Sequence, residues 1–126
     1  METLQEKELT EIIIGCAIEV HRILGPGLLE SAYELCLCQE LRLHKIPHER
    51  QEPLPVIYKG VRLESGYIMD IVVAQTVVVE LKSVPKSLPI HEAQLLSYLK
   101  LSPYSVGLLL NFNSPTLSEG IRRRVL

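Results

Sequence analysis

The sequence predicts a single α/β domain with a mixed central sheet flanked by helices, in the order ααβββαβ. Apolar residues recur at helical spacing over residues 4–44, and again over residues 89–101. Between them, residues 49–83 have β-branched and alternating patterns that predict strands, and the apolar run at 104–111 predicts a last strand. A length of 126 residues with 47% hydrophobic content suits one ordinary core, so we expect one domain over residues 1–126.

Two helices come first. The first begins at a capping box made by Thr3 and Glu6, and it ends at the Gly-Pro-Gly sequence of residues 25–27. The second covers residues 28–44 and ends before Pro47, because the residue that precedes a proline disfavours the helical conformation.

Extended segments occupy the middle of the chain. Residues 49–58 read as an edge strand, because their prolines cannot donate to a ladder. A hairpin turn at Lys59-Gly60 leads into a strand over residues 61–73, and Ala74-Gln75 turns the chain into a strand over residues 76–83.

The last third returns to a helix and a strand. Pro89 suits the first position of a helix that runs to about Leu101, and residues 104–111 read as a buried strand. The basic run Arg122-Arg123-Arg124 is predicted near the end of a short terminal helix.

Composition limits the function. The net charge of −2 and a pI near 6.1 exclude a global basic field, so binding to nucleic acid needs a local patch or a bound metal. The spacing of Cys16, Cys36 and Cys38 does not favour a zinc site, and His44 has no ligand partner at a useful spacing. We expect small buried thiols in a reducing cytoplasm, without a signal peptide or a membrane-spanning segment.

The candidate functional residues lie in three short segments of the sequence. Asp70 ends an alternating stretch, and Glu80 and Lys82 follow a β-branched run and project to the same side of a strand. If the two segments pair, two carboxylates and one ammonium meet on the sheet. Carboxylate oxygens are ligands that Mg²⁺ and Mn²⁺ prefer. Gln94 and Tyr98 lie at i and i+4, hence on one face of the following helix.

The spacing D-x9-E-x-K resembles the signature of PD-(D/E)xK nucleases, and Gln-x-x-x-Tyr resembles the motif of their RecB-type branch. Met69 stands where that signature has a proline, which carries no chemistry. The string Gly27-x-x-Glu30-x-x-Tyr33, with the segments around Glu80, Gln94 and Asn111, resembles the GxxExxY proteins from about Leu9 to Arg124.

This resemblance implies roles for the site residues. Asp70, Glu80 and the carbonyl of Leu81 would hold one or two Mg²⁺ or Mn²⁺ ions. Lys82 would orient the attacking water or stabilise the developing negative charge. Glu30 would add an acid to the cleft, although an acid in the first turn of a helix also complements the helix dipole.

Three further residues have both a functional and a structural interpretation. Gln94 would contact the metal region or a phosphate, or it would cap a polar helix face. Tyr98 would touch the substrate backbone or pack in the core, and His91 would touch phosphate or remain a solvated helix-start residue. Tyr33 is expected in the core or the cleft wall.

The sequence therefore predicts a divalent-metal-dependent nuclease that acts on DNA or RNA. The alternative is a non-catalytic module that binds nucleic acid or another partner and retains the fold, since fold alone does not determine function. The short acidic chain offers little surface to grip a duplex, and a homodimer would enlarge that surface.

Overall fold

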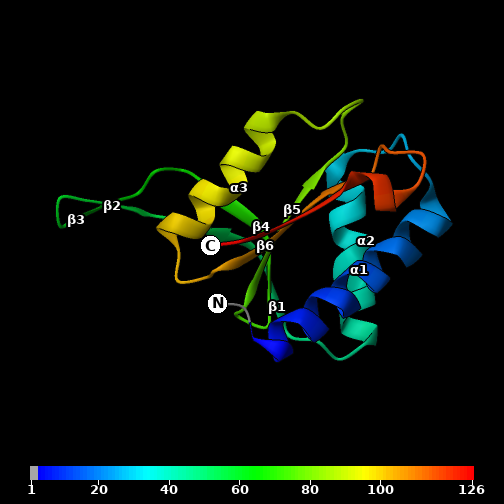
Figure 1. The fold of residues 1–126 in the computed structure, drawn as a ribbon, viewed down its shortest axis with the longest axis horizontal. Coiled ribbons are helices and arrows are strands. Elements are labelled where there is room, and N and C mark those ends of the chain that lie inside the picture. Colours follow the sequence, from blue (N-terminus) through cyan, green and yellow to red (C-terminus); the bar gives the residue numbers. More distant parts are fainter. Residues whose placement is uncertain (1–2) are drawn as a thin grey trace.

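A five-stranded sheet forms the middle layer of the computed structural model, which describes residues 3–126 (Figure 1). Helices α1 (Leu4–Leu24) and α2 (Glu30–Leu43) pack on one face of this sheet, and α3 (Pro89–Leu101) packs on the other. The strands of this sheet are β1 (His48–Pro53), β4 (Ile68–Val73), β5 (Val77–Lys82), β6 (Val106–Asn111) and β7 (Ile121–Val125), and β2 (Val56–Tyr58) and β3 (Val61–Leu63) form a separate hairpin.

The strand order β1-β4-β5-β6-β7 follows from the connections. A three-residue connection, 74–76, joins β4 to β5 in antiparallel fashion. It contains the predicted turn at Ala74 and Gln75, both of which have φ of 50°. Helix α3 carries the chain from β5 across the sheet to β6, and these two strands are parallel because a crossover helix separates them. The predicted α/β class with a mixed sheet is confirmed.

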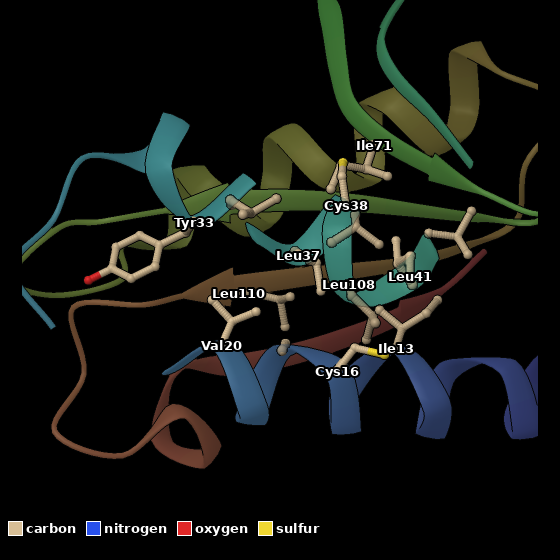
Figure 2. Close-up of a cluster of buried hydrophobic side chains, with 14 of the residues drawn as sticks. Ile13, Cys16, Val20, Tyr33, Leu37, Cys38, Leu41, Ile71, Leu108 and Leu110 are labelled. Carbon is tan, nitrogen blue, oxygen red and sulfur yellow. The ribbon is translucent and has the colours of Figure 1, made fainter. Parts of the chain in front are cut away.

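Strand alternation divides the core into two layers. Side chains of Ile71, Val79 and Leu108 face α1 and α2, whereas Val78 and Leu109 face α3. Figure 2 shows the larger cluster, in which residues of α1 and α2 pack against β4 and β6. The capping box of Thr3 and Glu6 is present at the start of α1, as predicted.

The predicted helical position of the terminal arginines is wrong. Arg122, Arg123 and Arg124 lie in β7, not in a helix, and the short helix η1 (Leu117–Gly120) ends before them. The backbone of β6 needs a hydrogen-bonding neighbour at this edge, and β7 supplies it in antiparallel register. Alternation then places Arg122 and Arg124 beside Glu92 of α3, and Arg123 beside Thr10 of α1.

Two strands that the sequence predicted as continuous are each divided. Residues 49–58 split into β1 and β2, and residues 61–73 split into β3 and β4. The turn at Lys59-Gly60 is confirmed, with φ of 48° and 78°, but the β2–β3 hairpin that it closes projects away from the main sheet (Figure 1). Gly66, at φ of 81°, bends the chain before β4. Both parts of the predicted edge strand lie at a sheet edge, β1 in the main sheet and β2 in the two-stranded hairpin.

The expected domain of residues 1–126 includes residues 1 and 2, which lie outside the described part. Within residues 3–126, no helix is long and apolar enough to cross a membrane.

The packing predicts opposite effects for alanine at two glycines. A Cβ at Gly120 would lie 2.3 Å from the carbonyl oxygen of Asn111, so we expect Gly120→Ala to lower the free energy of unfolding by about 1–3 kcal/mol. Gly15 is exposed on α1, and a Cβ there would have no atom within 4 Å. Gly15→Ala should therefore raise the free energy of unfolding by up to about 1 kcal/mol, because alanine favours the helix over glycine. Urea unfolding of both variants measures this difference, and equal effects would contradict the packing.

Candidate active site

A fork between two neighbouring strands forms the centre of the site. The ladder between β4 and β5 ends at the pair Ile71 and Val79, and beyond it each strand is held by a carboxylate of the other. The backbone N–H of Asp70 donates to Oε2 of Glu80 at 2.7 Å, and the N–H of Leu81 donates to Oδ2 of Asp70 at 2.8 Å. The sequence-predicted acids are therefore brought together, in the gap where the strands part.

Asp70 lies on the α2 side of this fork and Glu80 on the α3 side. Asp70 lines a cavity of about 170 Å³ on the α2 side, together with Glu30, Ser31, Glu34, Gln51 and Leu81. Glu80 follows the alternation of β5, in which Val78 faces α3, and it is buried. Because no ladder joins the strands at this point, each carboxylate can reach a backbone N–H of the opposite strand.

Lys82 and Gln94 meet on the α3 side of the fork. The Nζ of Lys82 donates to Oε1 of Gln94 at 3.2 Å, so α3 holds the ammonium in one position. Tyr98, one turn further along α3, is buried in the smaller core cluster, and its ring lies 6.0 Å from that of Tyr67. Burial and the charges of Glu80 and Asp70 raise the pKa of the Tyr98 hydroxyl.

Helix α2 adds acids from the other side. Glu30 accepts a hydrogen bond from the backbone N–H of Ser83 at 3.3 Å, which joins the first turn of α2 to the end of β5. Sequence reasoning missed Glu34, which lines the same cavity and is 5% exposed. It accepts from Nε of Arg50 at 2.8 Å and from Nε2 of Gln51 at 2.7 Å. Its i+4 spacing from Glu30 was the available signal, since such residues share a helix face.

Tyr33 anchors the turn that aims α2 at the fork. Its hydroxyl donates to the carbonyl of Gly25 at 2.6 Å and accepts from the N–H of Leu28 at 3.1 Å. Its ring stacks on Phe112 at 4.5 Å and is fully buried, which agrees with the predicted place in the core. The residue therefore fixes the entry to α2, and with it the position of Glu30.

The structure does not bring His91 to the carboxylates. Its Nδ1 accepts a hydrogen bond from the N–H of Leu88 at 3.1 Å, and among residues 3–126 it makes no hydrogen bond to the fork. The Arg122 and Arg124 side chains pair with Glu92, which offsets part of their charge.

Burial and mutual repulsion favour protons on the acids of the fork. Burial raises the pKa of Asp70, partly offset by the hydrogen bond from Leu81. Burial and then the Asp70 charge raise the pKa of Glu80 to about 8. A divalent cation would relieve the same repulsion, so the donor set suits one.

The ligand arrangement suits a cation that keeps several waters. Within residues 3–126, no protein hydrogen bond occupies the second carboxylate oxygen of Asp70 or of Glu80. The acids of the fork do not form a three-carboxylate cluster within 4.8 Å in the described part of the chain. Mg²⁺ is commonly held by one or two carboxylates with water, and this arrangement fits that pattern.

Comparison with known proteins identifies the protein family to which the chain is similar. The model of the PD-(D/E)XK nuclease superfamily matches residues 7–124. No curated protein and no solved structure matches the chain.

The raised pKa of Glu80 predicts a pH-dependent stability in metal-free protein. Glu80 keeps its proton up to about 8 in the folded state, whereas the ordinary value is 4.5. Between these values the folded state binds more protons than the unfolded state, so the free energy of unfolding falls as the pH rises. Thermal unfolding with a chelator should show this fall from pH 5 to pH 8, and Glu80→Gln should flatten it and melt higher at pH 8.

The matched control is Glu8→Gln, on the exposed surface of α1. This variant should keep the wild-type pH slope. A Glu80→Gln protein with the wild-type slope would contradict the assignment of the proton to Glu80.

Proposed function

The chain belongs to the PD-(D/E)XK nuclease superfamily, and we propose that it hydrolyses phosphodiester bonds of DNA or RNA with Mg²⁺ or Mn²⁺. The observation that carries this proposal is the fork of Asp70 and Glu80, with Lys82 held beside it by Gln94. An acid pair next to a fixed ammonium can bind a cation and stabilise negative charge that develops on a phosphate.

Each residue has a role in this proposal. Asp70, Glu80 and the carbonyl of Leu81 would hold the cation, and Glu30 would lie at the edge of the same cavity. The ion would polarise a phosphoryl oxygen and lower the pKa of a bound water. Lys82 orients that water or stabilises the phosphate charge, and Gln94 keeps the ammonium in position.

Within the superfamily, we propose membership of the GxxExxY proteins. The contacts of the G-x-x-E-x-x-Y string support this, because Tyr33 secures the turn before α2 and Glu30 reaches the end of β5. We also propose that residues 1–126 form one domain, and that the three free cysteines reflect a reducing cytoplasm.

Nucleic acid would be held by local positive charge on the surface. Lys86 follows β5 in the loop before α3, and Lys59 lies at the tip of the projecting hairpin. Arg62 already pairs with Glu64 at 2.8 Å. Pairing of a second copy of the chain would extend this small basic surface.

One observation favours the alternative of a non-catalytic binding module. Each carboxylate of the fork already accepts a backbone N–H, so the pair stabilises the strands without a metal. A protein that retained the acids for this reason would use the nuclease fold to bind a partner and would cleave no nucleic acid.

Replacement of Lys82 separates the two functions. With Mn²⁺ or Mg²⁺ present, we expect cleavage in a screen of single strands, duplexes, flaps and RNA, and Lys82→Met should lower the rate by about 10²–10³, the usual cost of one transition-state contact. Lys7→Met, on the exposed part of α1, is the control and should cleave normally. Metal binding without cleavage of any of these substrates would favour the binding module.

Metal titration tests the site without a substrate. Isothermal titration of Mn²⁺ should show binding to wild type that is lost in Glu80→Ala, because that change removes a ligand. Glu30→Gln should weaken binding yet keep the melting temperature within a few degrees, since glutamine can still accept from Ser83. A large loss of stability with unchanged affinity would make Glu30 a structural residue.

A further inference from the structure

A second cluster of metal-ligating side chains lies between α1 and α2, apart from the fork. One ligand atom each from Cys16, Glu40 and His44 comes within 4.8 Å of the other two, the only such group of three or more in residues 3–126. Cys16 belongs to α1, Glu40 lies in the last turns of α2, and His44 directly follows that helix. The sequence analysis found no partner for His44, because the thiol comes from another helix.

One measured distance in this cluster already equals an edge of a tetrahedral zinc site. The Sγ of Cys16 lies 3.5 Å from Nδ1 of His44, and this nitrogen lies 4.0 Å from Oε2 of Glu40. Ordinary Zn–S, Zn–N and Zn–O bonds at tetrahedral angles give about 3.5 Å between sulfur and nitrogen and about 3.3 Å between nitrogen and oxygen. The Glu40 carboxylate, which lies within 4.8 Å of both other ligand atoms, must move closer to them, and it lies near the surface.

The chemistry and the burial also suit such an ion. A thiolate, an imidazole and a carboxylate together favour Zn²⁺ over Mg²⁺. Cys16 is 2% exposed, whereas the side chains of Glu40 and His44 are 19% and 52% exposed, so an ion can enter from solvent and reach a dry thiol.

The competing interpretation is a metal-free helix end. The Nδ1 of His44 lies 2.9 Å from the carbonyl oxygen of Glu40, a contact that caps the last turn of α2. Binding of an ion would remove this contact, but the Glu40 carbonyl would keep the hydrogen bond that it accepts from the backbone N–H of His44 at 3.1 Å.

We propose that Cys16, Glu40 and His44 bind one Zn²⁺, with water as the fourth ligand, and that the ion clamps the end of α2 to α1. Binding displaces the thiol proton of Cys16 to solvent, and the thiolate then bonds to the metal. The imidazole of His44 must at the same time exchange its Nδ1 proton for one on the solvent-facing Nε2, so that Nδ1 is free to bond to the ion. The clamp stabilises the helical layer whose opposite end carries Glu30.

Zinc titration against a chromogenic chelator, with reduced and chelator-treated protein, tests the proposal. The Glu80→Gln background weakens binding at the fork, so the result does not depend on the proposed nuclease activity. We expect one equivalent of Zn²⁺ to bind and to raise the melting temperature. Co²⁺ should show thiolate charge transfer and tetrahedral d–d bands.

Matched variants locate the site. Cys16→Ala and His44→Gln should weaken the zinc affinity by at least the 10–100-fold that loss of an outer-shell partner costs. Cys38→Ala is the control, because Cys38 is also 2% exposed but faces the sheet core, and it should bind as the background does. His44→Gln, at an exposed position, keeps the test valid if Cys16→Ala does not fold. Absence of stoichiometric binding, or binding retained in His44→Gln, would overturn the proposal.

Discussion

The reciprocal hydrogen bonds between Asp70 and Glu80 and the backbone of the opposite strand are the constraint on which the site depends. Where β4 and β5 part, their backbone N–H groups lose the partners that a ladder would supply, and a buried N–H without a partner is costly. The two carboxylates satisfy these groups at 2.7 and 2.8 Å. The strands can therefore open inside a packed protein, and the opening is where the acids lie.

The three layers of the fold converge on this opening. The crossover through α3 makes β5 and β6 parallel and places Gln94 beside Lys82. Helix α2 reaches the fork from the other face with Glu30 and Glu34. Because Glu80 is buried and lies near the charge of Asp70, its pKa rises to about 8, and the site favours any cation that can replace its proton.

Helix α2 connects the two candidate metal sites of the molecule. Its first turn lies against the end of β5 through Glu30, and the anchor at Tyr33 sets its entry angle. Its last turns bring Glu40 and His44 to the thiol of Cys16 on α1. A hard, oxygen-rich site and a softer site with sulfur and nitrogen thus lie at opposite ends of one helix, and different metals should distinguish them.

Local sequence patterns encode the helical and strand periods, the capping box, the turn at Lys59-Gly60 and the candidate set around Asp70 and Glu80. These depend on neighbours within a few residues, and the spacing of the acids also resembles a known signature. In contrast, the packing of the three layers determines which backbone groups lack a ladder partner and which charges lie close together across layers. The terminal arginines form β7 because the edge of β6 needs a hydrogen-bonding strand. Glu34 lies in the cavity because it is buried beside Arg50, which donates a hydrogen bond to it. Contacts of this kind join residues far apart in the chain, so no local pattern contains them.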